Sequence, residues 1–97
     1  MEDILYYNEL YDCYSSLLTD KQRLYFENYY FDNLSLAEIA DNLDVSRNAV
    51  HKQLQITIEK LEEYEEKLEL NKKKKVLDKI IKSIGDKSIK EELEKLI

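Results

Sequence analysis

The sequence predicts an all-α fold built around a helix-turn-helix, and three observations favour this class. The 97 residues contain no proline and one glycine, whereas strands and hairpins need turn residues at short intervals. Charged side chains make up 37% of the chain and hydrophobic ones 43%, a balance typical of a helical protein. The stretch SLAEIADNLDVSRNAVHKQL, from Ser35 to Leu54, has the pattern of two short helices joined by a tight turn. We expect one compact or slightly elongated unit.

The first two helices are predicted from apolar spacing and from a capping pattern. Thr19 followed by Gln22 forms a capping box, in which two side chains satisfy free backbone N–H groups at a helix start. A second helix is therefore expected from Asp20 to Phe31, with too many large apolar groups for packing on one side only. Before it, apolar side chains at every third or fourth position form one stripe of a first helix. The stripe consists of Ile4, Tyr7, Tyr11, Tyr14 and Leu18.

The third and fourth helices form the predicted helix-turn-helix. Ser35 with Glu38 makes a second capping box, which opens the third helix. The segment DNLDVS ends that helix, because its side chains compete for backbone hydrogen bonds and Asp44 tolerates left-handed backbone angles. Ser46 caps an extended fourth helix, whose apolar pattern runs to about Glu69. The residues expected to face inward are Leu36, Ile39, Ala40, Leu43, Val45, Val50 and Leu54.

Two additional C-terminal helices are predicted beyond the fourth. The four lysines from Lys72 to Lys75 form either a solvated helix segment or a linker. The apolar spacing from Val76 to Ile84 indicates a fifth helix, which Gly85 is expected to end at its C-cap. Ser88 followed by Glu91 predicts the cap of a last short helix. The apolar residues of that helix are Leu93, Leu96 and Ile97.

Charge is divided unevenly along the chain, whose formal net charge is -6. Residues 1–71 hold 6 basic and 16 acidic side chains, a net charge of -10, whereas residues 72–97 hold 9 basic and 5 acidic ones, a net charge of +4. Opposite net charges predict that the two parts attract each other. We assign a helix-turn-helix domain to residues 1–70 and a basic C-terminal helical extension to residues 71–97.

Several classes of protein and site are not expected from this sequence. It has no run of about 18 apolar residues, and it begins with Glu2 and Asp3 instead of a basic and then apolar segment, so we expect no membrane span and a soluble, cytoplasmic protein. Cys13 is the single cysteine, which predicts a small buried side chain and neither a disulfide nor a metal cluster. Since no serine, histidine and acid arrangement is present, we expect no enzyme activity and no cofactor.

The outward face of the fourth helix predicts contact with the major groove of double-stranded DNA. A helix-turn-helix lays the start of its second helix in that groove. Arg and Lys side chains pair there with guanine or phosphate, and Asn and Gln side chains pair with adenine. From Ser46 to Ile58 there are two basic side chains and no acid, so this face is positive although the chain is not. The candidate DNA-binding residues are Ser46, Arg47, Asn48, His51, Lys52 and Gln55, with a plain surface position as the alternative for His51.

Weak binding by a single copy is expected, because two or three basic groups contribute little salt-dependent affinity. A homodimer would add the contacts of two recognition helices. Dimerisation is also predicted because the tyrosine stripe and the extended fourth helix together exceed what one small monomer can bury.

The segment from Leu17 to Leu68, roughly half the chain, resembles a known family. It reads LLTDKQRLYFENYYFDNLSLAEIADNLDVSRNAVHKQL and later IEKLEEYEEKL. These motifs resemble the YlxM-type family, small bacterial helix-turn-helix proteins linked to the signal recognition particle operon, and the helix-turn-helix also looks like region four of sigma factors. The resemblance implies a DNA-binding, regulatory fold and a role in the signal recognition particle pathway. It places Ser46, Arg47, Asn48, His51 and Lys52 on the sigma-like contact face.

Two departures from the family pattern and one charge run leave a second interpretation open. Asp44 stands where many such motifs have glycine, and Asp41 lies near the expected DNA surface. The run EEYEEKLE, from Glu62 to Glu69, would repel phosphate and attract a basic protein surface, although it is also typical of a solvated helix face. In this interpretation the helix-turn-helix is a scaffold, and the partner is the signal recognition particle protein or its RNA.

Overall fold

A computed structural model describes residues 3–96, and within this range every regular element is helical. The all-α prediction is therefore confirmed. None of these helices combines the length with the hydropathy that crossing a lipid bilayer requires. The elements are α1 (Ile4–Tyr14), the short 3-10 helix η1 (Ser15–Leu17), α2 (Asp20–Tyr30), α3 (Leu36–Leu43), α4 (Arg47–Leu68), α5 (Leu70–Ser83) and α6 (Lys87–Glu94).

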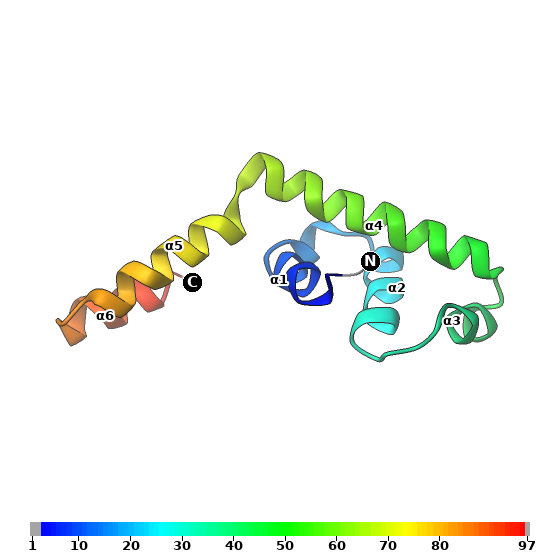
Figure 1. Cartoon of the computed structure of the whole chain (residues 1–97), viewed down its shortest axis with the longest axis horizontal. Helices are drawn as coiled ribbons and strands as arrows, with labels where there is room; N and C mark the ends of the chain where they lie inside the picture. The colour runs from blue at the N-terminus through cyan, green and yellow to red at the C-terminus, as the bar shows by residue number, and fades with distance from the viewer. Residues whose placement is uncertain (1–2, 97) are drawn as a thin grey trace.

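The long helix α4 organises the molecule. α1, α2 and α3 pack along one side of it, and α5 with α6 leaves from its C-terminal end as an arm, a name used here for residues 70–96 (Figure 1). The extents are 54 × 25 × 23 Å and the radius of gyration is 16.8 Å. A compact domain of this length would have a radius of gyration of about 12.5 Å. The arm, which packs mainly on α1 and on itself, accounts for the elongated shape.

Local capping chemistry sets the ends of α2, α3 and α4 as the sequence predicts. Thr19 and Ser35 both form complete capping boxes. Asp44 adopts the left-handed conformation at φ 54° and ψ 49° and ends α3. Ser46 then caps α4, because its Oγ accepts a hydrogen bond of 3.1 Å from the Ala49 N–H. These contacts join α3 and α4 through a short turn, which confirms the helix-turn-helix.

Two hydrophobic clusters hold α1, α2 and α3 against α4. In the first cluster, tyrosine and phenylalanine rings of α1 and α2 pack on the middle of α4. Most of the predicted tyrosine stripe is therefore covered by this chain's own helices, although Ile4 at its start remains 53% exposed. The buried members are Leu10, Tyr11, Tyr14, Leu18, Phe26, Tyr30, Ile58 and Leu61. The second cluster, in the helix-turn-helix, consists of Tyr25, Ile39, Ala40, Val50 and Leu54.

Two expectations about side-chain position and helix ends are wrong, and one alternative that the sequence left open is decided. Val45 was expected to face inward but is 37% exposed, because it lies in the turn before α4. α5 begins at Leu70, so the four lysines belong to a helix and not to a linker. α5 ends before Ile84, and Gly85 has no positive φ, so the glycine C-cap was wrong. Ile97 lies outside the described residues.

The expected cap of the last helix, Ser88, was also wrong. Asp86, not Ser88, caps α6: its Oδ1 accepts hydrogen bonds from the backbone N–H of Ser88 at 2.9 Å and of Ile89 at 3.2 Å. An aspartate side chain competes well for this position, since its carboxylate accepts two N–H groups at once and favours the positive end of a helix.

The joint between α4 and α5 is fixed by a side chain of α1. Glu69 separates α4 from α5 and adopts the left-handed conformation at φ 53°. The Tyr14 hydroxyl donates a 2.5 Å hydrogen bond to Glu65 and accepts one of 3.0 Å from the Leu70 N–H. Glu65 also accepts hydrogen bonds from the N–H groups of Asn71 at 3.0 Å and Lys72 at 3.1 Å. Glu65 and Tyr14 thus satisfy the free N–H groups that begin α5.

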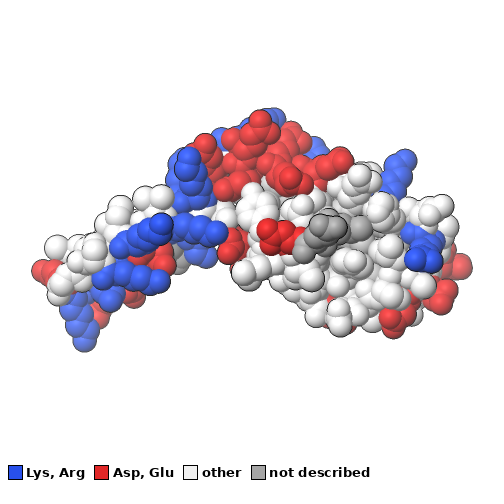
Figure 2. Space-filling model, viewed as in Figure 1, with Lys and Arg blue, Asp and Glu red and all other residues white. Residues whose placement is uncertain are grey.

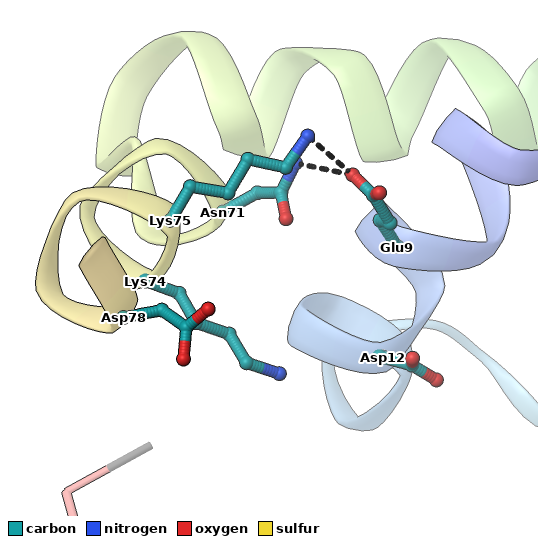
Figure 3. A pocket seen from close by; sticks show the side chains of 6 residues that line it. All are labelled: Glu9, Asp12, Asn71, Lys74, Lys75 and Asp78. Carbon is teal, nitrogen blue, oxygen red and sulfur yellow. Dashed lines mark hydrogen bonds and ion pairs between the residues drawn. The ribbon is translucent and has the colours of Figure 1, made fainter. Parts of the chain in front are cut away.

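A second contact between α1 and the arm involves Glu9. Its carboxylate lies 2.8 Å from the Lys75 ammonium and accepts a 3.1 Å hydrogen bond from the Asn71 amide, as Figure 3 shows. The hydrogen bond from Lys75, followed by that from Asn71, lowers the pKa of Glu9 below its ordinary value. The acidic region of residues 1–71 and the basic region of residues 72–97 therefore form an ion pair at this point. The adjoining cavity of about 280 Å³ is lined by Glu9, Asp12, Asn71, Lys74, Lys75 and Asp78.

Candidate nucleic-acid interface

The six candidate residues lie at the surface around the start of α4. Ser46 is the N-cap, and the other five lie in the first three turns of the helix. The arm leaves from the opposite end of α4 and does not cover this segment (Figure 1). All six are exposed: Ser46, Arg47, Asn48, His51, Lys52 and Gln55. The segment is therefore accessible to a large ligand, and the assignment of DNA contacts to it remains a prediction.

The back of this segment is anchored in the second hydrophobic cluster. Val50 and Leu54 are fully buried, and they pack on Ile39 and Ala40 of α3 and on Tyr25 of α2. Ala40, which is 6% exposed, has a methyl side chain that leaves room for α3 and α4 to approach closely. A helix start held on one side by packed aliphatic groups presents its other side at a fixed orientation, which recognition of a groove requires.

The electrostatic character of the segment is positive at its start. Arg47 and Lys52 carry its positive charges, and no acidic side chain occurs between Ser46 and Ile58. The first turn adds partial positive charge from backbone N–H groups, of which the Ser46 hydroxyl satisfies one. Across the turn, Asp41 and Asp44 are exposed and negative. The positive region is therefore narrow.

The same face of α4 becomes acidic in its second half. Glu59, Glu62 and Glu66 follow Gln55 at steps of three and four residues, so they continue its line along the helix surface, and all three are exposed. Figure 2 shows acidic side chains gathering over the second half of α4, with lysines along α5. A phosphate backbone is attracted to the start of this face and repelled beyond Gln55.

A groove beside the candidate residues was missed by the sequence prediction. It has a volume of about 270 Å³, and it joins α1 to the exposed face of α4. Glu59 and Glu62 could have been assigned to this surface from their helical spacing to Gln55. Tyr7 carried no such signal, because its place depends on how α1 packs against α4. The groove is lined by Tyr7, His51, Gln55, Ile58, Glu59 and Glu62.

The histidine, cysteine and acidic residues within residues 3–96 do not form a metal site. No group of three or more histidine, cysteine or acidic residues in this range is arranged to hold a metal ion. Cys13, expected to be buried, is half-buried against the first hydrophobic cluster, and desolvation raises the pKa of its thiol. The exposed, acid-free surface at the start of α4 is the candidate site.

Comparison with known proteins relates the whole chain to one family. The family model described as "UPF0122: Putative helix-turn-helix protein, YlxM / p13 like" matches residues 1–97. A UPF0122 protein of Halalkalibacterium halodurans is 43% identical over 101 residues, which cover 100% of this chain and 93% of the relative.

Two further relatives support the same assignment. A UPF0122 protein of Bacillus pumilus is 48% identical over 94 residues, covering 93% of this chain and 86% of the relative. A UPF0122 protein of Shouchella clausii is 53% identical over 73 residues, covering 75% of this chain and 67% of the relative. Because the family match spans the chain and these identities extend over most of it, the protein belongs to the UPF0122 family of YlxM / p13-like helix-turn-helix proteins.

Proposed function

We propose that this protein binds double-stranded DNA through the start of α4 and acts in gene regulation. One observation carries the proposal: an acid-free polar face, exposed to solvent, is held rigidly by a buried aliphatic back. Its side chains offer the hydrogen-bond groups that read base edges in the major groove. The residues proposed to contact DNA are Ser46, Arg47, Asn48, His51, Lys52 and Gln55.

Individual roles follow from position and chemistry. Arg47 and Lys52 supply charge for phosphate or guanine, and Asn48 and Gln55 supply the paired donor and acceptor that adenine requires. The Ser46 hydroxyl already accepts the Ala49 N–H, so its main part is to hold the helix start in place. The acidic continuation of the face confines contact to the first turns of α4.

A homodimer is part of this proposal. Two basic side chains per copy give weak binding, and joining two copies makes the second contact effectively intramolecular. Because most of the tyrosine stripe is buried within the chain, the surface that joins the copies lies elsewhere. A cytoplasmic location follows from the proposed DNA target.

The decisive experiment compares two double variants of equal charge change. Arg47→Ala with Lys52→Ala should lower affinity for duplex fragments about tenfold or more. It should also make the slope of log affinity against log salt concentration shallower, by the equivalent of roughly two phosphate contacts. Lys60→Ala with Lys67→Ala removes the same charge from the second half of α4 and should change little. Fluorescence anisotropy at several salt concentrations measures both. Equal losses in the two variants, or no salt-sensitive binding by the unaltered protein, would refute the proposal.

The acidic second half of α4 favours a second candidate function. Glu62 and Glu66 are exposed there on one face, which repels nucleic acid and complements a basic protein surface. As the alternative, we propose that this face binds the signal recognition particle and that the helix-turn-helix serves as a scaffold. Of the particle's two components, charge favours the protein over the RNA.

Capture experiments with the purified particle protein and the purified RNA, tested separately, address this alternative. Glu62→Gln with Glu66→Gln should weaken capture of the protein component severalfold, whereas Arg47→Ala with Lys52→Ala should not. Retention on neither component would remove the alternative. Retention on the RNA that requires Arg47 and Lys52 would instead assign nucleic-acid binding to the start of α4.

A further inference from the structure

The arm buries little of its apolar surface within the chain. α5 and α6 have 14 and 8 residues, lengths at which a helix needs packing to persist. Among the described arm residues, Ile81 is the buried hydrophobic side chain, at 2% exposure. Four others are half-exposed or more, namely Val76 (51%), Ile80 (50%), Ile89 (52%) and Leu96 (73%). The arm therefore has an apolar surface that this chain does not cover.

Two of these side chains form a ridge on α5, and a third lies on α6. Val76 and Ile80 are four residues apart on α5 and share a face, Ile89 is exposed on α6, and Leu96 follows the end of α6. Such pairs are the ridges by which antiparallel helices interdigitate. Each helix of the arm thus offers a contact surface in addition to the one used between α5 and α6.

The charges of the two arm helices are opposite. Residues 70–83 contain six lysines and one aspartate, whereas residues 86–96 contain four acidic side chains and three lysines. The basic helix α5 therefore attracts an acidic helix, and it repels a second α5. α6 of another copy of this chain offers both the exposed Ile89 and a net negative charge.

We propose that the arms of two copies pack about a two-fold axis, with α5 of each copy against α6 of the other. In this four-helix arrangement every α5 has two α6 neighbours, and the basic helices lie on a diagonal. The contact is closed, because the same surface serves both copies. The arm leaves α4 at the end opposite the candidate DNA-binding residues, so both recognition segments stay exposed (Figure 1).

This inference rests on the dimer in the proposed function and supplies its surface. Light scattering on the full chain, without DNA, tests it. The unaltered protein should have twice the 11.6 kDa chain mass at tens of micromolar, and Ile80→Glu or Ile89→Glu should weaken dimerisation at least a hundredfold. Leu24→Glu, at a 46% exposed leucine of α2, is the matched control and should leave the dimer intact. Circular dichroism of each variant verifies folding.

A charge exchange tests the pairing of α5 with α6. Changing Lys72, Lys73, Lys79 and Lys82 to Glu leaves two lysines and five acidic side chains in residues 70–83, which makes α5 acidic. Glu91→Lys with Glu94→Lys leaves five lysines and two acidic side chains in residues 86–96, which makes α6 basic. Each variant should therefore be monomeric alone. Mixed in equal amounts, the two should form a heterodimer. All six positions are exposed, so the substitutions are compatible with the folded chain.

Three outcomes would overturn the inference: a monomeric unaltered protein at high concentration, dimers that survive Ile80→Glu and Ile89→Glu, or charge variants that do not recombine. An arm-mediated dimer that fails to bind DNA would instead uphold this inference and remove the proposed function. DNA binding by a persistent monomer would overturn this inference and the dimer of the proposed function, and it would uphold DNA binding through the start of α4.

Discussion

Raising the pH from 10 to 12 is expected to unfold this protein cooperatively. Tyr11, Tyr14 and Tyr30 are each at most 9% exposed. The pKa of each of these hydroxyls is raised, and desolvation by burial is the largest cause in all three. The pKa of Tyr14 is raised to about 12. Hydrogen bonds from Tyr11 to Glu27 and from Tyr14 to Glu65 raise the pKa further, because a carboxylate disfavours a neighbouring phenolate.

The direction of this pH dependence follows from the raised pKa values. An unfolded tyrosine ionises near pH 10, so the stability contributed by the neutral hydroxyls is fully present below pH 10. It is lost as the pH rises through the folded pKa, because the unfolded chain then binds fewer protons. Three such groups together remove roughly 4 kcal/mol per pH unit, a large part of the free energy of unfolding of a small domain.

Far-ultraviolet circular dichroism and tyrosinate absorbance, recorded on the same samples, measure this transition. Helix loss and ionisation of the buried tyrosines should occur together. Tyr30→Phe is an informative variant, because the Tyr30 hydroxyl is buried without a hydrogen-bond partner among residues 3–96. This variant should be at least as stable at neutral pH and should unfold at higher pH. Full ionisation of the tyrosines near pH 10 with the helices intact would contradict the prediction.

Glu65→Ala is expected to lower the free energy of unfolding by about 2–4 kcal/mol. The change removes the acceptor of the buried Tyr14 hydroxyl and of the Asn71 and Lys72 N–H groups. Those donors then lack partners at a partly buried helix start, and the beginning of α5 should fray. Urea denaturation measures the loss of stability, and small-angle X-ray scattering measures the altered position of the arm.

The exposed neighbour Glu66 provides the matched control for this variant. Glu66→Ala changes the same residue type on the same helix and should cost less than about 0.5 kcal/mol. Glu65→Gln keeps one acceptor oxygen, so its loss in the free energy of unfolding should lie between those of Glu65→Ala and Glu66→Ala. If Glu65→Ala and Glu66→Ala proved equally mild, the α1 contact would not be what holds the joint.

The sequence was sufficient for elements whose ends are set by neighbouring residues. The two capping boxes at Thr19 and Ser35 and the left-handed Asp44 involve atoms at most a few positions apart. Their geometry can therefore be predicted without knowledge of the tertiary fold. The tyrosine stripe was also placed correctly on α1, but its burial by α2 and α4 required the packing of three helices.

The start of α5 could not be predicted from the sequence around it. Leu70 has no side-chain cap before it, and its N–H is satisfied by Tyr14, far away in the sequence. Gly85 indicated a left-handed end that the chain does not use, since Ile84 is already extended. A local sequence pattern can indicate that a residue permits a conformation, but it does not establish that the conformation occurs.

In the candidate site, too, the features set by local helical spacing were predictable and those set by tertiary packing were not. The exposure of Arg47 and Lys52 followed from helical spacing, but their part in DNA binding is still a prediction. Glu59 and Glu62 share that spacing with Gln55, but Glu62 was assigned only to the acidic run from Glu62 to Glu69, and Glu59 was not assigned. The neighbouring Tyr7 belongs to the groove because of a contact between helices distant in sequence.

The rigid α4 also links the angular positions of its two ends. One residue inserted between Gln55 and Glu65 would turn the arm by about 100° around the helix axis relative to the recognition segment. An insertion of four residues would bring it back to within about 40° while moving it about 6 Å further away. Length changes in this helix are therefore tolerable only in near-whole turns if two copies are to present their reading surfaces to the same side of a duplex.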